Sequence, residues 1–304
     1  MARVTVVGAG VVGLSCAVRL LEAGHRVDVL ARELPPETTS AVAAAIWYPY
    51  LAEPRDRVLA WGTTAYAVFE RLAGRPDTGV VLRHGTEAFR EAGPRPWWAD
   101  AVPDLAPAER LPEGFHGGWT FTAPVVEMPV YLRWLAERVQ AHGGTLTRLT
   151  VGGLPTGPDL VVNCSGLGAR LLAGDREVVP VRGQVVLLEQ VGLEEWWLDG
   201  SGLTYVIPRS RDIVVGGTEQ PGEWSPTPDP ETAERLLATA RARVPALAEA
   251  RVVGHRVGLR PARSGIRLER EGSVIHCYGH GGSGVTVSWG CAAEVAALAA
   301  EVLG

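Results

Sequence analysis

Lysine is absent from this chain, and all 29 basic residues among its 304 are arginine. Without a lysine the protein cannot form a Schiff base with pyridoxal phosphate. A phosphate-binding P-loop lysine and a lysine general base are excluded for the same reason. The absence of lysine therefore excludes these three kinds of lysine-dependent site.

Cysteines are few and long hydrophobic runs are missing. Cys16, Cys164, Cys277 and Cys291 are scattered without metal-ligand spacing, so no metal site is expected. We interpret them as small buried hydrophobic residues, with a structural disulfide as the alternative. The 46% hydrophobic content and net charge of −5 are those of an ordinary globular protein and do not indicate nucleic-acid binding. No apolar run approaches the roughly 18 residues of a membrane span, and the first strand begins almost at Met1, which leaves no room for a signal peptide. We therefore expect a cytoplasmic protein.

The first thirty-odd residues carry the most informative pattern. The β-branched run Arg3–Val7 leads into a G-x-G-x-x-G turn from Gly8 to Gly13, a helical stretch follows, and Arg26–Leu30 is again apolar. This is the pattern of a dinucleotide-binding βαβ unit, whose glycines permit a tight turn, a close pyrophosphate and close helix packing. Glu33 lies 20 residues after Gly13, where an acceptor for a ribose hydroxyl is expected. The motif indicates a bound dinucleotide but does not choose between NAD and FAD.

Hydrophobic periodicity predicts the other elements. The expected helices are Ala41–Ile46, Asp56–Ala73, Met128–His142, Glu231–Arg243 and Val285–Leu303. The expected strands are Val80–Leu82, Glu87–Phe89, Trp119–Phe121, Thr145–Leu149, Pro158–Cys164, Val178–Leu188, Thr204–Ile207, Ile213–Gly217, Arg251–Leu259, Ile266–Glu269 and Val274–His276.

This order predicts an α/β fold, α+β overall, with two interleaved domains. A Rossmann-like nucleotide-binding domain, discontinuous in sequence, would comprise residues 1–50, 125–180 and 262–304. A mostly antiparallel β-sheet domain for the substrate would comprise residues 51–124 and 181–261.

A second glycine cluster, Tyr278–Gly284, immediately precedes the closing helix. A helix N-terminus carries about half a positive charge and stabilises negative charge that develops nearby. A reduced flavin is an anion at its N1–C2=O edge and would be stabilised there, whereas a nicotinamide cofactor has no need of a second such site. The two glycine-lined helix starts therefore favour FAD.

Motifs along nearly the whole chain resemble those of the D-amino acid oxidases and D-aspartate oxidases, a family of FAD-dependent enzymes, and most of all the bacterial D-amino acid oxidases. The motifs are Val6–Ser15, Ala31–Pro35, Thr38–Ser40 through Trp47 with Pro49 and Tyr50, Val162–Gly166, Arg182–Gln184, Gly258–Pro261, Ile266–Glu269, Val274–Gly282 and Gly290–Ala292. The closing motif is the family's own signature, and Cys277 departs from the residue usual at its position.

The resemblance implies that a hydride passes from the Cα of a D-amino acid to flavin N5. O2 then reoxidises the flavin to give hydrogen peroxide, and the imino acid hydrolyses to a 2-oxo acid and ammonia. Arg260 matches the family's carboxylate-binding arginine, Tyr205 matches a tyrosine that meets the same carboxylate, and the Gly282 carbonyl would accept a hydrogen bond from the amine. We expect neutral or hydrophobic substrates, because the aromatic residues of Trp47–Tyr50 favour them and no cation for a side-chain carboxylate can be assigned.

The resemblance also implies a non-covalent FAD site. Its expected residues are Gly8, Ala9, Gly10, Val11, Val12, Gly13, Arg32, Glu33, Thr38, Thr39, Ser40, Ala44, Ala45, Ile46, Ser165, Gly166, Arg260, Gly279, Gly281, Gly282, Ser283, Gly284, Val285 and Thr286. Trp47 and Tyr48 would line the flavin or the side-chain pocket, or else pack in the core. Leu198–Leu203 is short and lacks the second tyrosine of the longer lid in mammalian members, so we expect a more open entrance.

Several alternatives stay open at this point. The protein could be a D-aspartate oxidase, a flavin amine oxidase of the glycine or sarcosine type, or a nicotinamide dehydrogenase, and a non-catalytic dinucleotide-binding protein is a remote option. The expected partners are a small D-amino acid and O2, without nucleic acid or membrane, and a homodimer is one option for the assembly.

Overall fold

The structure is a computed structural model that describes residues 1–50 and 52–304. Its strands are β1 (Arg3–Val7), β2 (Arg26–Ala31), β3 (Val80–Phe89), β4 (Ala106–Pro107), β5 (Gly117–Val126), β6 (Thr145–Arg148), β7 (Leu160–Asn163), β8 (Val179–Glu189), β9 (Trp196–Asp199), β10 (Tyr205–Pro208), β11 (Asp212–Gly216), β12 (Gln220–Pro221), β13 (Val252–Glu271) and β14 (Val274–His280). Its helices are α1 (Val11–Glu22), α2 (Arg55–Ala73), α3 (Met128–Ala141), α4 (Ala169–Leu172), α5 (Pro230–Arg243) and α6 (Gly284–Leu303).

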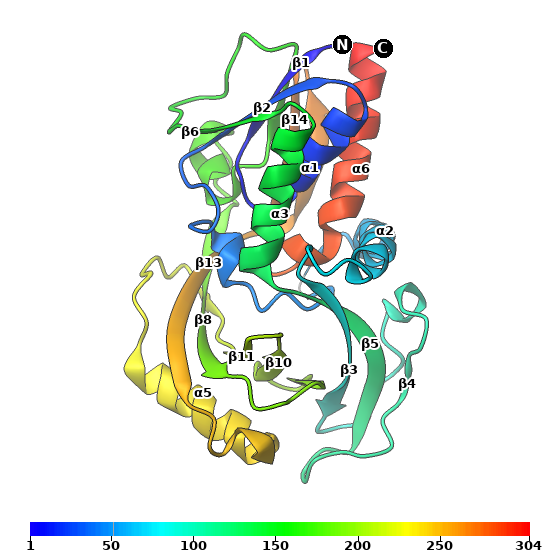
Figure 1. The fold of residues 1–304 in the computed structure, drawn as a ribbon, viewed down its shortest axis with the longest axis vertical. Coiled ribbons are helices and arrows are strands. Elements are labelled where there is room, and N and C mark those ends of the chain that lie inside the picture. Colours follow the sequence, from blue (N-terminus) through cyan, green and yellow to red (C-terminus); the bar gives the residue numbers. More distant parts are fainter. Residues whose placement is uncertain (51) are drawn as a thin grey trace.

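One mixed sheet of 14 strands runs through the described chain (Figure 1). At one end, β14, β7, β1, β2 and β6 pair in parallel in that order. Valines such as Val4, Val6 and Val29 are fully buried there, as expected for parallel strands that are covered on both faces. Helix α1 packs against α6 and α3 beside these strands. This half confirms the predicted βαβ unit and its Rossmann-like character.

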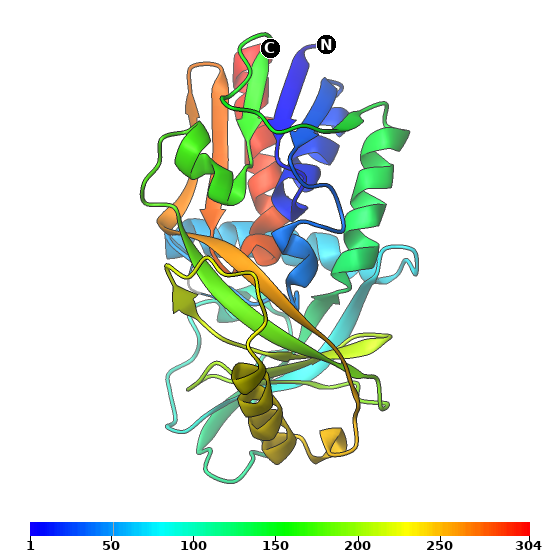
Figure 2. The same cartoon turned by 90° about the vertical axis from the view of Figure 1, so that its left-hand side faces the viewer.

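The other half of the sheet is mostly antiparallel, as predicted. Strand β8 pairs with β11 and β13, and β10 pairs with β9 and β11. Strands β8 and β13 are long, and Figure 2 shows both running from the parallel half into the antiparallel half. Helix α5 packs against β8 and β11 and closes a second apolar core. The division into two domains at the predicted boundaries stays a prediction.

The predicted helix Ala41–Ile46 is wrong. Only a 3₁₀ turn forms, at Thr39–Val42, and Ala45 has a left-handed backbone with φ of 58°. The Ala45 carbonyl accepts a hydrogen bond from the Val126 amide, and Trp47 N donates to Pro124 O. Pairing with β5 therefore outweighs the helix propensity of the alanines.

Several strands are longer than predicted, because glycine and proline inside them do not end them. Strand β3 is continuous through Gly85, where a Cβ would lie 2.2 Å from the Trp196 carbonyl oxygen and 2.3 Å from its ring. Glycine is needed there for close packing against β9, a strand that the sequence analysis missed. Strand β13 continues through Pro261, which faces Pro180 of β8, so the two residues that lack a backbone N–H donor lie opposite each other.

Helix α6 corrects the expectation about hydrophobic length. It spans 20 residues with a mean hydropathy of 1.3 over an 18-residue window, enough by length and composition to cross a membrane. However, 56% of that window is buried inside the protein, and α6 packs along α1 and α2. At Gly290 a Cβ would lie 2.2 Å from the Trp61 Cα, so α2 and α6 are in close backbone contact. A buried core helix passes the same test, so this is weak evidence for a membrane span.

Candidate active site

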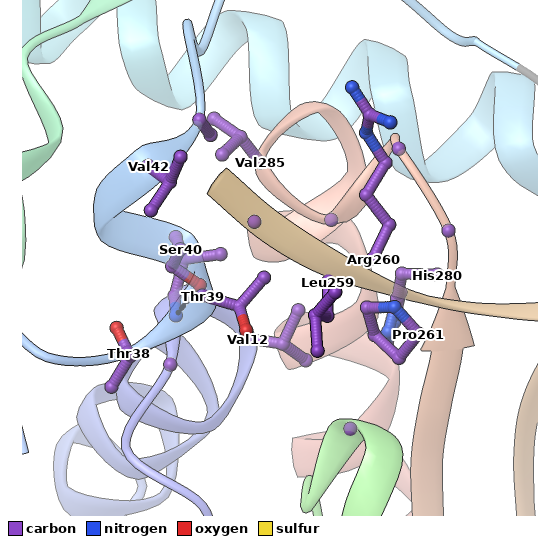
Figure 3. Close-up of a pocket in the computed structure, with 18 of the residues that line it drawn as sticks. Val12, Thr38, Thr39, Ser40, Val42, Leu259, Arg260, Pro261, His280 and Val285 are labelled. Atoms are coloured by element: carbon purple, nitrogen blue, oxygen red, sulfur yellow. Dashed lines mark hydrogen bonds between the residues drawn. The ribbon is translucent and has the colours of Figure 1, made fainter. Parts of the chain in front are cut away.

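A cavity of about 800 Å³ extends from the Gly8–Gly13 turn to Tyr205 and Arg260. The turn lies at the carboxyl end of β1, where open α/β sheets place their ligands. Figure 3 shows part of the wall, with Thr38–Ser40 on one side and Leu259–Pro261 with His280 on the other. The cavity is therefore lined by residues from both the parallel and the antiparallel half of the sheet.

The glycine turn at the N-terminus of α1 is sterically required. A Cβ at Gly8 would lie 2.3 Å from the Cys164 carbonyl oxygen, and one at Gly13 would lie 2.0 Å from the Gly8 carbonyl oxygen. Helix α1 begins after Gly10 without a side-chain cap hydrogen bond and has no acidic residue in its first turn. Ser40 Oγ accepts a hydrogen bond from Val11 N at 3.1 Å. The helix thus presents amide groups and a positive dipole end, which suit a pyrophosphate.

Polar side chains near this end of the cavity fit the rest of a dinucleotide. Arg32 and Glu33 follow β2, and Arg32 Nη2 lies 2.8 Å from Glu33 Oε1. Thr38 is 7% exposed, and its Oγ1 has no hydrogen-bond partner among residues 1–50 and 52–304. A buried hydroxyl of this kind is readily satisfied by a ligand.

All the predicted cofactor residues line the cavity except Gly279, Ser283 and Thr286. Ser283 Oγ donates to the Tyr50 carbonyl at 2.6 Å, and Thr286 Oγ1 donates to the Tyr48 carbonyl at 2.9 Å. At Gly279 a Cβ would lie 2.9 Å from a neighbouring side-chain carbon, so this glycine serves packing. The structure therefore places these three residues behind the wall, where Ser283 and Thr286 fix the Tyr48–Tyr50 segment.

Trp47 and Tyr48 have different environments, although the sequence suggested the same roles for both. Trp47 is 1% exposed, does not line the cavity, and donates from Nε1 to the Gly62 carbonyl at 3.0 Å. It belongs to the core, which was the alternative interpretation. Tyr48 lines the cavity, and so does Tyr50.

The side chains of Arg260 and Tyr205 each pack directly against the backbone of a glycine. A Cβ at Gly183 would lie 2.4 Å from the Arg260 guanidinium, and one at Gly216 would lie 2.1 Å from the Tyr205 ring. Arg260 Nη1 donates to the Thr218 carbonyl at 2.9 Å. Within the part of the chain that the structure describes, no carboxylate pairs with Arg260. Its guanidinium is thus available for the carboxylate of a ligand.

Two neighbours complete this end of the cavity. Burial raises the pKa of Tyr205, while the adjacent Arg260 guanidinium works against that rise, so Tyr205 keeps its proton and remains a hydrogen-bond donor. A Cβ at Gly282 would lie 2.9 Å from Tyr50 Cδ1 and 3.8 Å from Arg260 Cδ. The structure therefore brings together the three predicted catalytic residues: Arg260, Tyr205 and Gly282.

Sequence analysis missed Glu87, which also lines the cavity. Glu87 is 2% exposed, and its Oε1 accepts a hydrogen bond from the Tyr48 hydroxyl at 2.5 Å. Burial raises the pKa of Glu87 to about 7, against the opposing effect of the Tyr48 hydrogen bond. Nothing in the local sequence around Glu87 signals this environment, because Tyr48 lies 39 residues away.

A protein-family model described as "FAD dependent oxidoreductase" matches residues 3–298. The chain belongs to this FAD-dependent oxidoreductase family. It is 51% identical over 317 residues to the D-amino-acid oxidase of Rubrobacter xylanophilus, covering 100% of this chain and 97% of that protein. It is 39% identical over 325 residues to the human D-aspartate oxidase, covering 99% of this chain and 95% of that protein. The resemblance noted from the motifs is confirmed.

Solved structures agree on the fold of this FAD-dependent oxidoreductase. The glycine oxidase from Geobacillus kaustophilus superposes with a TM-score of 0.82 at 22% identity, covering 99% of this chain and 95% of that one. The predicted fold class is therefore confirmed. The cavity wall fits FAD, because the α1 N-terminus would offer amide groups to its pyrophosphate and the buried Thr38 hydroxyl has no partner among the described residues.

The four cysteines of the oxidoreductase are not scattered in space. The sulfur atoms of Cys16, Cys164 and Cys277 lie within 4.8 Å of one another, as do the ligand atoms of Cys277, His280 and Cys291. All four thiols are free, and hydrogen bonds from Cys16, Cys164 and Cys291 lower the pKa of Cys277. Thiol and imidazole groups at this spacing suit a soft metal ion. The sequence analysis expected no metal site, and that expectation stays a prediction.

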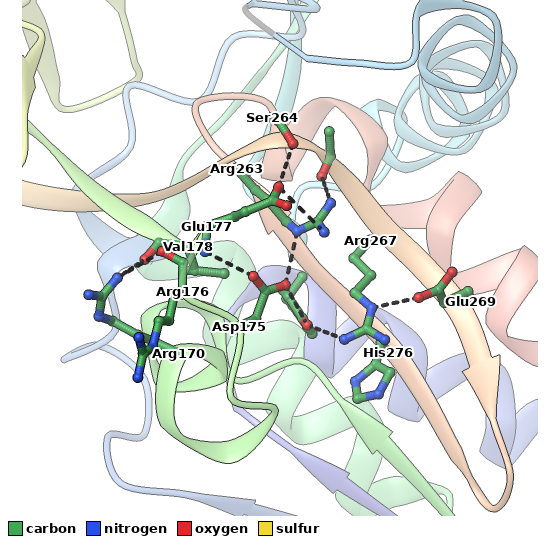
Figure 4. A network of polar contacts seen from close by, with 12 residues as sticks. Arg170, Asp175, Arg176, Glu177, Val178, Arg263, Ser264, Arg267, Glu269 and His276 are labelled. Atoms are coloured by element: carbon green, nitrogen blue, oxygen red, sulfur yellow. Dashed lines mark hydrogen bonds and ion pairs between the residues drawn. The ribbon is translucent and has the colours of Figure 1, made fainter.

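A polar network supports the wall from behind (Figure 4). Asp175 Oδ2 accepts hydrogen bonds from the Tyr278 hydroxyl and from Arg263 Nε, each at 2.9 Å. Arg267 Nη1 donates to the Tyr278 hydroxyl at 2.7 Å. Burial alone would raise the pKa of Asp175, but the hydrogen bonds from Tyr278 and Arg263 outweigh it and lower that pKa. The network fixes β14, which leads into the glycine cluster.

Proposed function

We propose that this FAD-dependent oxidoreductase oxidises the Cα–N bond of D-amino acids with neutral side chains, giving a 2-oxo acid, ammonia and hydrogen peroxide. The observation that carries the proposal is the Arg260 guanidinium, which faces the cavity beside Tyr205 without a carboxylate partner among the described residues. The names of the similar D-amino-acid oxidases support it.

Each residue of the substrate end has a defined task in this proposal. The planar fork of Arg260 binds the substrate carboxylate through two N–H groups, and the neutral Tyr205 hydroxyl donates a third hydrogen bond. The Gly282 carbonyl accepts a hydrogen bond from the amine and so orients Cα. Bound FAD supplies the hydride acceptor and the reaction with O2. No side-chain base is required, because the lone pair of the neutral amine drives hydride loss, and positioning accounts for most of the catalysis.

Charges on the wall favour neutral substrates over acidic ones. Among the described residues that line the cavity, the arginines are Arg32 and Arg260. Arg32 belongs to the dinucleotide end, and Arg260 is used by the α-carboxylate. A side-chain carboxylate would instead face Glu87, which disfavours D-aspartate and D-glutamate.

The short segment Leu198–Leu203, most of which lines the cavity, supports the proposal of an open site. Asp199–Leu203 forms a compact turn, in which Asp199 accepts hydrogen bonds from Ser201 N at 3.0 Å and Gly202 N at 3.1 Å. We expect no slow lid closure, and rapid-mixing kinetics with such a step would contradict this. Non-covalent FAD, which acid precipitation would release, and a cytoplasmic location belong to the same proposal.

The test is peroxide production by the purified yellow protein with D- and L-forms of methionine, valine, alanine and aspartate. We expect turnover of the neutral D-forms, little with D-aspartate and none with the L-forms. Higher kcat/KM for D-aspartate than for the neutral D-forms would identify a D-aspartate oxidase. Turnover of L-forms alone, or of none of these compounds, would refute the proposed function.

A further inference from the structure

Glu87 lies in a row of cavity residues that begins at Tyr205. Leu198 of β9 is the register partner of Tyr205 on β10 and of Glu87 on β3. Register partners point to the same face of a sheet, and all three residues line the cavity. Since neighbouring strands lie about 4.8 Å apart, Glu87 is about 10 Å from Tyr205 along this row. The row leads from the carboxylate-binding end of the cavity to a second carboxyl group.

The Glu87 carboxyl group is only half satisfied. Its Oε1 accepts from the Tyr48 hydroxyl at 2.5 Å, whereas its buried Oε2 has no partner in residues 1–50 and 52–304. The Tyr48 ring in turn packs against Trp98 at 5.4 Å between centroids, which fixes the hydroxyl. Buried polar oxygens normally have a partner, and a ligand in the cavity that Glu87 lines can supply one. An N–H donor on the ligand would supply what is missing.

We propose that Glu87 determines specificity by binding the far end of a substrate side chain that carries an ammonium, guanidinium or amide N–H group. This inference rests on the proposed function, because Arg260 and Tyr205 must hold the α-carboxylate at the opposite end of the row. It extends the proposed substrates from neutral side chains to long side chains that end in an N–H donor, including cationic ones. A D-amino acid with a long side chain that ends in an N–H donor reaches from Arg260 to Glu87 and donates a hydrogen bond to Glu87 Oε2. Apolar side chains of equal length fit the same space along Leu198 but leave Oε2 unpaired.

The test compares D-lysine with D-norleucine, which differ only in the terminal ammonium group. The holoenzyme is assayed for peroxide at about pH 8.5, where Glu87 is mostly ionised because its pKa is about 7. The variants are Glu87→Gln and Glu87→Leu. Glu194→Gln is the matched control, because Glu194 is an exposed carboxylate just before β9, with 82% of its side chain accessible.

We expect the kcat/KM ratio of D-lysine to D-norleucine to fall by about tenfold or more in both Glu87 variants, since hydrogen bonds to charged groups are the stronger ones. D-Norleucine turnover should fall less than D-lysine turnover in the Glu87 variants, and the control should retain the wild-type ratio. An unchanged ratio in Glu87→Gln, with D-norleucine still oxidised, would overturn the role of Glu87 and leave the proposed function intact. Failure of the wild type with every D-amino acid would refute the proposed function itself.

A binding measurement on the wild type removes any dependence on how the variants fold. Hexanoate and 6-aminohexanoate share the carboxylate for Arg260 and differ at the end that faces Glu87. Titrations followed by the flavin spectrum should give a Kd for 6-aminohexanoate at least about tenfold lower. Equal affinities, or tighter binding of hexanoate, would contradict the inference.

Discussion

Replacing Arg260 should remove the contact that we propose for the substrate carboxylate. In the structure the Arg260 guanidinium lies over Gly183 and donates one hydrogen bond, from Nη1 to the Thr218 carbonyl at 2.9 Å. Its other N–H groups are available to a ligand. A hydrogen bond to a charged group contributes about 1.5–3 kcal/mol, which corresponds to about a 10- to 150-fold change. Arg260→Ala should therefore raise KM for D-methionine by at least that range. Arg260→Lys should fall between Ala and wild type, because lysine retains the charge but not the planar fork.

Steady-state peroxide assays with a full D-methionine titration measure this effect. Arg256→Ala is the matched control, because Arg256 lies on the same strand, is exposed, and bonds only the neighbouring His255 carbonyl at 2.8 Å among the described contacts. The flavin-to-protein ratio of each variant shows whether the site is intact. An unchanged KM in Arg260→Ala with normal flavin content would refute the assigned carboxylate contact.

Three further predictions concern cofactor binding and stability. Gly8→Ala places a Cβ 2.3 Å from the Cys164 carbonyl oxygen, so the purified variant should have a much lower flavin-to-protein ratio; a normal ratio would contradict the tight turn. Burial raises the pKa of Glu87 from 4.5 to about 7, so ionised Glu87 destabilises the fold as pH rises through that interval. Glu87→Gln should exceed wild type in unfolding free energy by up to roughly 3 kcal/mol at pH 8 and lose that advantage below pH 4.5, as measured by urea denaturation. Asp175→Asn weakens the contact with Tyr278 and should lower the unfolding free energy by about 1.5–3 kcal/mol at pH 7. Because the pKa of Asp175 is lowered in the folded protein, this difference should shrink as pH falls below 3.8. Equal stability of variant and wild type at pH 7 would contradict the role of the network.

Features that depend on local geometry were predictable from the sequence. The glycines from Gly8 to Gly13 reflect contacts within one turn and its neighbouring strand, so their spacing alone indicates a dinucleotide site. The position of Arg260 and Gly282 in one cavity was predictable, because each lies in a short motif that resembles the family's; their roles stay predictions. The structure adds the reason for these motifs, since Arg260 requires the bare backbone of Gly183 beneath it.

Features that depend on distant pairing were not predictable. Burial raises the pKa of Glu87 against the opposing effect of the Tyr48 hydrogen bond, and neither the burial nor Tyr48 is visible in residues 80–89. The cysteines are separated by more than a hundred residues in places, yet Cys16 Sγ and Cys164 Sγ are 4.0 Å apart. Alanine-rich Ala41–Ile46 has helical propensity, but pairing with β5 decides its conformation.

Anaerobic reduction of the bound flavin by single amino acid enantiomers tests the proposed reaction most directly, because it separates hydride transfer from reoxidation by O2. D-Methionine added to the oxygen-free yellow protein should bleach the visible flavin bands within the turnover time, and admitting O2 should restore them together with one equivalent of peroxide. L-Methionine should leave the spectrum unchanged. Bleaching by L-methionine alone, or an oxidised flavin that no D-amino acid reduces, would contradict the assignment.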